Sequence, residues 1–366
     1  MRRIRQFAIN SALVLASLAL GLLFCELVLF RFVLLPSDVP ANAFTNGLVR
    51  YAPNQSGVWR IRNDVAAPFR INAQGWNTGA GDYVRERKAG VGRVAVVGDS
   101  MIEAMQVAHD RSMAERLAAD LSTEGRPTEV YRFAVSGAPL TQYLLMIERE
   151  VLAYQPDAVV VLLCHNDFDE MFRFVQGRYT SSFLKLRMAG GQVAEEIPPV
   201  PWKPTLADWL RRTATARYLY YRWQVRVDTL RNVLLGIAPA QAQRYEANVD
   251  IAAVERVWPD VVAATDHVFG RLEALARRSG TRLVIVIDGV RQAIYDGDTS
   301  QALALNRLAG ELAGKHGFAF VDLHPAFQAD WRANRQGFEL PSDSHWNEHG
   351  HMVAARAVAA ALREAR

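Results

Sequence analysis

Four short polar motifs follow one another along this chain. Each lies at the end of an apolar run or just before the C-terminal helix. The motifs are Gly98-Asp99-Ser100, Ser136-Gly137, Asn166-Asp167 and Asp343-Ser344-His345. Because the carboxyl ends of parallel strands meet at one edge of a sheet, loops far apart in the sequence converge there. This order therefore favours a fold in which strands separated by helices bring the four motifs together.

Apolar periodicity predicts the elements between these motifs. We expect strands at 93–97, 130–135, 158–164, 283–287 and 319–321, and helices at 100–121, 140–152, 261–278, 301–316 and 350–366. The run at 158–164 is continuously apolar, as is typical of a strand buried on both faces. Strands that alternate with helices indicate an α/β chain with a central parallel sheet and helices on both faces.

The residue types in the motifs are those needed for acyl transfer through a serine ester. Ser100 is the candidate nucleophile, because a hydroxyl between a strand and a helix meets backbone N–H groups; a helix-capping serine is the alternative. The N–H groups of Ser100 and Gly137 and the side chain of Asn166 are the candidate oxyanion donors. Gly137 and Asn166 are also ordinary turn residues.

His345 is the candidate general base, and Asp343 is the carboxylate that would orient its ring. A metal site made of Asp343, His345, His349 and His351 is a weaker alternative, since no cysteine or HExxH helix accompanies it. We therefore expect no metal and no cofactor. The remaining polar residues near the motifs have expected supporting roles: His165 lines the pocket, His324 is structural, and Asp99 and Asp167 hold turns through backbone hydrogen bonds.

The first 35 residues combine a basic head with a long apolar stretch. Arg2, Arg3 and Arg5 precede an almost uninterrupted apolar run at 7–25, which as a helix would span roughly 28 Å, close to the thickness of a bilayer core. The basic head favours the cytoplasmic side and places the rest of the chain beyond the membrane. A cleaved signal peptide is the less favoured alternative, because no small-x-small cleavage site follows the apolar run before Pro36. A lipoprotein signal is disfavoured by bulky Phe24 directly before Cys25, and a buried core helix fits the length of the run poorly.

Composition excludes some other functions. With 42 basic and 38 acidic side chains, the net charge of +4 is too small to indicate nucleic-acid binding. Cys25 lies in the apolar segment and Cys164 ends a predicted strand, so a disulfide between them is implausible. At 366 residues the chain is long enough for one large domain or two small ones.

Two stretches interrupt the strand–helix rhythm. Residues 36–90 contain four prolines and predict an extended connector that ends in short strands near 69–72. Residues 168–260 form an insertion with an expected aromatic, basic helix at 208–233, in which Trp209, Tyr218, Tyr220, Tyr221 and Trp223 lie. These rings would face substrate or membrane, or would pack the insertion onto the main sheet. We favour the packing interpretation, because aromatic residues at helical spacing usually belong to a core.

The chain resembles the SGNH (GDSL-type) hydrolases, and more narrowly their bacterial membrane-anchored members. The four family blocks correspond to Gly98-Asp99-Ser100, Gly137, Asn166-Asp167, and Asp343 with His345; a Phe69–Gly75 phrase and a closing His-Trp-Asn-x-x-Gly run add to the likeness. The resemblance implies a flavodoxin-like αβα sandwich. Two positions depart from the family pattern: Cys164 replaces a frequent glycine, and Ser342 stands where the aspartate is often found, three residues before the histidine.

The resulting hypothesis is a single-pass protein of the bacterial inner membrane with a periplasmic serine esterase domain. It divides the chain into a cytoplasmic head (1–6), a transmembrane anchor (7–35), a connector (36–90) and a hydrolase domain (91–366). The substrate would be an acylated small molecule or glycan with an O-acetyl or other short acyl ester. The alternatives are an O-acyltransferase for envelope or secreted polysaccharide, with a polysaccharide-modifying membrane partner, and a non-catalytic glycan-binding or scaffold protein.

Overall fold

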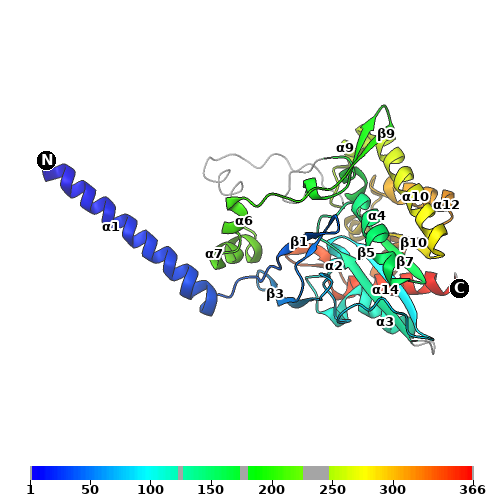
Figure 1. Ribbon diagram of the computed structural model, residues 1–366, viewed down its shortest axis with the longest axis horizontal. Helices are drawn as coiled ribbons and strands as arrows, with labels where there is room; N and C mark the ends of the chain where they lie inside the picture. The colour runs from blue at the N-terminus through cyan, green and yellow to red at the C-terminus, as the bar shows by residue number, and fades with distance from the viewer. Residues whose placement is uncertain (1, 123–126, 174–179, 226–246, 365–366) are drawn as a thin grey trace. The chain divides into compact units, whose positions relative to one another are not determined.

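The structure is a computed structural model and describes residues 2–122, 127–173, 180–225 and 247–364. Contacts between Cα atoms divide the chain into two compact units (Figure 1). The first comprises Met1–Val39, Val58–Ala66 and Lys203–Pro239, and the second comprises Pro40–Gly57, Ala67–Trp202 and Ala240–Arg366.

A five-stranded parallel sheet forms the centre of the second unit. Its strand order is β11-β10-β7-β5-β6, with β5 at Gly92–Gly98, β6 at Thr128–Ala134, β7 at Ala158–Leu163, β10 at Arg282–Ile287 and β11 at Ala319–Asp322. Numbered by their order in the chain, the strands run 2-1-3-4-5, which is the doubly wound flavodoxin order. The predicted fold class is therefore confirmed, and all five predicted strands are present within one or two residues.

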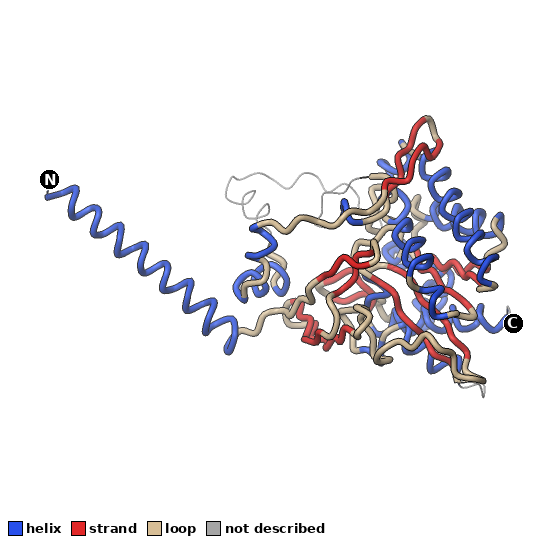
Figure 2. The backbone as a smooth tube through the Cα atoms, in the orientation of Figure 1, coloured by secondary structure: helices blue, strands red, loops and turns tan. Residues whose placement is uncertain are grey.

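Helices cover both faces of this sheet. Side chains of successive strand residues point to opposite faces, and both faces of the strands are apolar and buried. Ala95 and Val97 belong to one apolar cluster, and Val94 and Val96 belong to the other. The first cluster includes residues of α4 (Leu140–Arg149), α9 (Ile251–Arg256), α10 (Trp258–Ser279) and α12 (Leu303–Lys315). The second includes residues of α2 (Ser100–Glu103), α3 (Met113–Ser122), α11 (Arg291–Asp296), α13 (Leu323–Asn334) and α14 (Glu348–Glu364). Figure 2 shows the strands in red among the blue helices.

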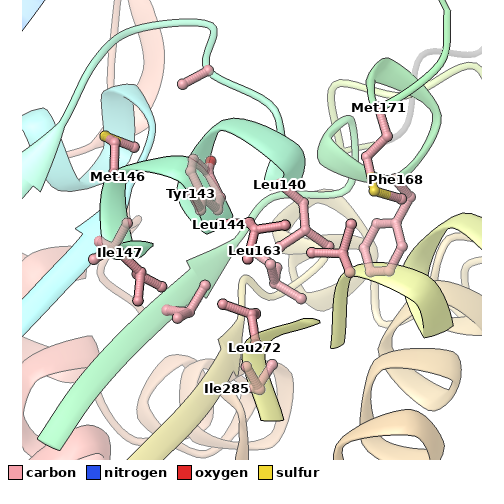
Figure 3. Packing of buried hydrophobic residues seen from close by; sticks show 14 of the residues in the cluster. Leu140, Tyr143, Leu144, Met146, Ile147, Leu163, Phe168, Met171, Leu272 and Ile285 are labelled. Carbon is pink, nitrogen blue, oxygen red and sulfur yellow. The ribbon is translucent and has the colours of Figure 1, made fainter. Parts of the chain in front are cut away.

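The core on the α4 side is closely packed. Figure 3 shows Leu144 of α4 and Leu272 of α10 near Leu163 of β7 and Ile285 of β10, and all four side chains are fully buried. The stretch expected as a connector also contributes to this cluster through Leu48, in the β1–β2 hairpin, and Trp76. The hairpin strands are β1 (Asn42–Thr45) and β2 (Leu48–Tyr51), which pair antiparallel.

One of the helices predicted beside the sheet is wrong. The expected helix at 100–121 is broken into α2, a 3-10 turn η2 (His109–Arg111) and α3. Ala104 ends α2 in the left-handed conformation with φ 53°. Neither glycine nor proline occurs at this break, so the sequence contains no residue that would predict the end of the helix there. The remaining short elements are η3 (Val151–Tyr154), α5 (Asp167–Glu170), η4 (Thr180–Ser182), the hairpin β8–β9 (Lys185–Ala189 and Gln192–Ile197), and the pair β12–β13 (Glu339–Leu340 and Asp343–Trp346).

The first unit contains the apolar N-terminal helix. Helix α1 (Arg2–Phe24) continues as a π-helical segment, η1 (Cys25–Val33). Among the described residues, this is the one helix long and apolar enough to cross a bilayer. The unit also contains part of the two-stranded ribbon β3–β4 (Gln55–Ile61 and Val65–Ile71) and the short helices α6 (Leu206–Leu210), α7 (Ala214–Ala216) and η5 (Arg217–Arg222).

The prediction of one continuous helix at 208–233 is wrong for residues 208–225, which form the separate short helices α6, α7 and η5. Residues 226–246 lie outside the described part of the chain. The favoured packing interpretation is also wrong for two of its aromatic residues. Tyr218 stacks on Phe30 of η1, with ring centroids 4.4 Å apart, and Tyr221 contacts Trp59. These residues belong to the first unit rather than to the unit that contains the sheet.

Candidate active site

Ser100 lies immediately beyond the carboxyl end of β5, at the first position of α2. Asp99 caps this short helix by accepting a hydrogen bond from the Met101 N–H at 2.9 Å, as expected for a turn-holding carboxylate. A Cβ added at Gly98 would lie 2.5 Å from Cγ1 of Ile102, so only glycine fits where the chain turns closely over its own helix. The turn therefore holds Ser100 at the carboxyl edge of the sheet beside the neighbouring strands β5 and β7, where the strand order reverses, which is the topological switch point.

Asp343 and His345 lie on strand β13 and not in a loop. Because alternate residues of a strand point to the same face, their spacing of two places both side chains on one side. The Asp343 carboxylate is hydrogen-bonded to Nδ1 of His345 and also accepts the His345 backbone N–H at 2.9 Å. This spacing on a strand explains how Asp343 reaches the imidazole, although Ser342 occupies the position where the family often has its aspartate.

The structure brings the three predicted residues into one hydrogen-bonded series. Nε2 of His345 lies 2.8 Å from Oγ of Ser100, although 245 residues separate them in the sequence. Burial alone would lower the pKa of His345, but its hydrogen bond to Asp343 and the charge of that carboxylate raise the pKa above its usual value. Burial alone would raise the pKa of Asp343, but its bonds to His345 lower it. Both shifts favour an ionised carboxylate beside an imidazole that accepts a proton readily.

The loop after β6 places Ser136 and Gly137 beside the Ser100 turn. Ala138 N–H donates to the Val135 carbonyl at 3.2 Å, which closes a tight turn with Gly137 at φ +71°. A side chain would meet no atom there, but an L-residue in this left-handed conformation costs about 1–2 kcal/mol. Glycine therefore lets the turn form without strain.

Glu103 is a residue of this site that sequence reasoning missed. It is 2% exposed, and its carboxylate accepts the Ser136 N–H at 3.0 Å and the Ser136 hydroxyl at 2.7 Å. The Tyr51 hydroxyl donates to the same carboxylate. Burial raises the pKa of Glu103 despite these bonds. Since Glu103 lies in the same short helix as Ser100, it connects the nucleophile turn to the Gly137 turn.

Asn166 follows β7, as predicted, and starts helix α5. Its side chain is hydrogen-bonded to the carboxylate of Glu170. A primary amide carries two N–H donors, so one remains for a second acceptor. Asp167, the next residue, is fully buried and accepts the Cys164 N–H at 2.7 Å, as expected for a residue that holds the turn.

Asp167 belongs to a buried polar cluster behind the Ser100 turn. The Tyr143 hydroxyl donates to its carboxylate at 3.0 Å, and the thiol of Cys164 donates to Asp99 at 3.5 Å. Burial and the nearby Asp99 raise the pKa of Asp167 well above its usual value. Cys164 therefore replaces the frequent family glycine without exposing its thiol; it and Cys25 are free cysteines.

Arg291 and Asp288, which follow β10, are two further residues that the sequence did not single out. The Arg291 guanidinium donates to the Ser344 carbonyl at 2.8 Å and pairs with Asp288 at 3.4 Å. Asp288 in turn accepts the indole N–H of Trp346 at 3.1 Å. These bonds fix β13 at Ser344, between Asp343 and His345, and at Trp346, directly after them. Their only sequence signal was polar residues directly after a predicted strand.

The other histidines have partners of their own. His349 is hydrogen-bonded to Asp330, and Nδ1 of His351 accepts the Met113 N–H, so neither points with His345 toward a shared ligand. In the described ranges no group of three or more candidate metal ligands occurs. His165 is fully buried against Asn306 at 2.8 Å, and burial lowers its pKa to about 4. His324 accepts the Val290 N–H at 3.3 Å, in keeping with a structural role.

A parallel αβα sandwich with a serine, a histidine and an aspartate in series at its carboxyl edge is the architecture of a class of acyl hydrolases. The chain belongs to the GDSL-like lipase/acylhydrolase family, whose family model matches residues 96–353. The match includes Ser100, Gly137, Asn166, Asp343 and His345, and it includes the insertion as well. The SGNH (GDSL-type) resemblance seen in the sequence is therefore confirmed.

Solved structures that are similar to this chain include the following three. TesA is 15% identical, with a TM-score of 0.40 over 74% of this chain and 98% of its own. The acetyl xylan esterase AlAXEase is 15% identical, with a TM-score of 0.38 over 75% of this chain and 98% of its own. An acetylxylan esterase from Geobacillus stearothermophilus is 12% identical, with a TM-score of 0.40 over 76% of this chain and 96% of its own. No curated protein sequence matches the chain.

Proposed function

We propose that this protein is a membrane-anchored serine esterase that faces the periplasm and cleaves O-acetyl or other short acyl esters. The observation that carries the proposal is the series Asp343–His345–Ser100, with 2.8 Å between the imidazole and the hydroxyl. A serine hydroxyl is a weak nucleophile until a base accepts its proton, and the raised pKa of His345 suits that task.

In the proposed reaction, Ser100 Oγ attacks the ester carbonyl while its proton moves to Nε2 of His345. The Asp343 carboxylate holds the ring by Nδ1 and stabilises the imidazolium that forms. The negative charge on the carbonyl oxygen is met by the N–H groups of Ser100 and Gly137 and by the Asn166 amide. His345 then protonates the leaving alcohol, and a water molecule, deprotonated by His345, releases the acid from Ser100.

The anchoring proposal rests on the helix at Arg2–Val33 and on what its last turns contact. The Glu26 carboxylate accepts the N–H groups of Ala214 and Thr215, each at 2.9 Å, and Phe30 stacks on Tyr218. Removal of this segment as a signal peptide would leave the start of α7 and the ring of Tyr218 without these partners, so the contacts favour a retained helix. Arginines before the helix favour a cytoplasmic N-terminus, which would put the hydrolase domain in the periplasm.

The test is hydrolysis of p-nitrophenyl acetate by the full chain in detergent, beside Ser100→Ala and the control Ser344→Ala. Ser344 is exposed and points away from Asp343 and His345 on the same strand. We expect Ser100→Ala to fall to the background rate and Ser344→Ala to retain activity. Equal rates in all three proteins would contradict the proposal, provided that circular dichroism shows them folded.

The same variant proteins distinguish the esterase from the two alternative functions. An O-acyltransferase shares the acyl-enzyme but passes the acyl group to a sugar hydroxyl, so an added oligosaccharide would lower acetate release and become acetylated. A non-catalytic glycan-binding protein would bind oligosaccharide without covalent labelling of Ser100 by a serine-reactive phosphonate.

A further inference from the structure

A second surface of the protein is unusual for its exposed apolar side chains. In α6, Leu206, Trp209 and Leu210 are 75%, 70% and 54% exposed. Their spacing of i, i+3 and i+4 puts them on one face of the helix. The start of α6 is closed by a capping box between Thr205 and Asp208, and Asp208 is buried. The capped helix therefore holds these three apolar side chains together on one exposed face.

The following segment extends this surface. Leu219, Tyr220 and Trp223, in and directly after η5, are about 40% exposed. The guanidinium of Arg211, at the end of α6, lies over the ring of Tyr220 at 5.7 Å, which brings the two segments together. We call residues 203–225 the aromatic collar. Contiguous exposed apolar surface of this kind marks an interaction site in a folded protein.

The charges of the aromatic collar are strongly one-sided. It contains Lys203, Arg211, Arg212, Arg217 and Arg222 but a single acidic residue, Asp208. Leucine, tryptophan and tyrosine beside arginine and lysine are the residue types that concentrate at a membrane–water interface. The positive charge is complementary to anionic lipid headgroups.

The collar is attached to the last turns of the N-terminal helix. Besides the Glu26 cap on α7 and the Phe30–Tyr218 stack, the Arg217 guanidinium donates to Asp38 at 2.9 Å, just beyond η1. In Figure 1, α7 lies beside the end of the blue helix α1–η1 within the first unit. A helix that starts at Arg2 and crosses a bilayer would leave it near these residues, since about 20 residues span the apolar core.

We propose that the aromatic collar docks on the lipid bilayer that the N-terminal helix crosses. Leu206, Trp209 and Leu210 enter the headgroup region, while the exposed Arg212 meets lipid phosphates. The occupant is lipid rather than another protein, because the surface is joined directly to the membrane-exit turns of the anchor and carries the charge that anionic lipid requires. The inference rests on the proposed membrane anchoring, and it adds a second contact that holds the first unit flat on the membrane.

The distribution of tryptophan makes a direct test available. The chain has eight tryptophans, none in residues 1–35, and two of them, Trp209 and Trp223, lie on the exposed collar. Brominated acyl chains quench only those indoles that enter the bilayer, so the anchor itself contributes no signal. The full chain is reconstituted in vesicles of phosphatidylcholine and phosphatidylglycerol, with brominated and ordinary acyl chains compared.

We expect bromolipid to quench the full chain. Trp209→Phe with Trp223→Phe should remove most of the quenched fraction, whereas the control Trp331→Phe, in α13 of the second unit, should leave it unchanged. Arg211→Gln with Arg212→Gln should lower quenching in anionic vesicles more than in neutral ones. None of these residues belongs to the proposed catalytic machinery, so esterase activity in detergent should persist in every variant.

The opposite results separate the two proposals. If the full chain stays in the vesicles after a carbonate wash but its tryptophans are not quenched, the docking proposal is overturned and anchoring stands; the collar is then free for a protein partner. If carbonate removes the full chain from the vesicles, anchoring itself fails. Quenching that persists in the Trp209→Phe/Trp223→Phe protein would also overturn the docking proposal, because another part of the chain would then be in the lipid.

Discussion

The two sides of the Ser100 turn are each organised by a carboxylate, and the two carboxylates differ in the groups that they contact. On the β13 side, Asp343 faces an imidazole that becomes a cation when it accepts a proton, and the pKa of Asp343 is lowered. On the Gly137 side, Glu103 accepts hydrogen bonds from the neutral donors of Ser136 and Tyr51, and burial raises its pKa. The first arrangement requires a negative charge, whereas the second requires acceptors in fixed positions. Substitutions that remove charge but preserve shape should therefore harm the two sides unequally.

The largest effect is expected from removal of the base. His345→Ala deprives Ser100 of its proton acceptor, and turnover of p-nitrophenyl acetate should fall about 10⁶-fold, toward the rate of the uncatalysed reaction. His267→Gln is the matched control, since His267 is a partly exposed histidine paired with Glu196 on β9. Both rates are measured on the full chain in detergent. Appreciable turnover in His345→Ala would mean that another group deprotonates Ser100.

Asp343→Asn should produce the next largest loss, about 10³–10⁴-fold in kcat. Asparagine keeps the shape of the side chain but removes the charge that stabilises the imidazolium, and it favours the wrong tautomer of His345. The comparison variant is Ser342→Ala, at the position where the family often has aspartate. A large loss in Ser342→Ala with little loss in Asp343→Asn would reverse the assignment of the carboxylate.

On the other side of the turn, Glu103→Ala should lower kcat about 10²-fold and leave KM nearly unchanged, because the Ser136–Gly137 turn loses its support and oxyanion stabilisation weakens. Glu103→Gln retains a carbonyl acceptor and removes the charge, so it should recover most of the activity. This contrast with Asp343→Asn is the sharpest test of the comparison. Equal losses in Glu103→Gln and Glu103→Ala would show that Glu103 acts through its charge.

The Glu103 contacts should also be non-additive with Ser136. Ser136→Ala removes one of the bonds that Glu103 accepts, so the double variant with Glu103→Ala should lose little more kcat than Glu103→Ala alone. Additive losses would indicate that the two residues act independently.

The two sides also differ in how far the sequence predicts them. Ser100, Gly137 and Asn166 were predictable because each follows a strand of strong apolar pattern, and parallel strands align their carboxyl ends. Asp343 and His345 were predictable as a pair from their spacing of two. Glu103 was not, because residues 100–121 have the pattern of one amphipathic helix, in which a glutamate is an ordinary exposed residue. The left-handed turn at Ala104 breaks that helix and leaves Glu103 buried against Ser136.

For the aromatic collar, the sequence left a surface facing substrate or membrane as the less favoured interpretation, for a related reason. Periodicity shows that Tyr218 and its neighbours lie on a helical surface, but it does not say which partner covers that surface. The partner is Phe30, far away in the sequence, and Trp209 has little cover at all. The residue pattern predicts strands and helices well in the sheet, where every strand packs against neighbours of the same kind. It predicts the packing of a helix poorly where one contact with a residue far away in the sequence decides it.

The smallest expected effect is a shift in pH dependence. The base must be neutral to accept a proton, so kcat/KM should fall as the pH drops through the pKa of His345, with a midpoint above the usual 6.5. Asp343→Asn removes the hydrogen-bonded charge that raises this pKa, so the midpoint of its residual activity should move to lower pH. Glu103→Gln should leave the midpoint where it is, because Asp343 and not Glu103 sets the protonation of the ring. A midpoint that moved in Glu103→Gln and stayed constant in Asp343→Asn would show that the charge at the site resides on the opposite side from the one argued above.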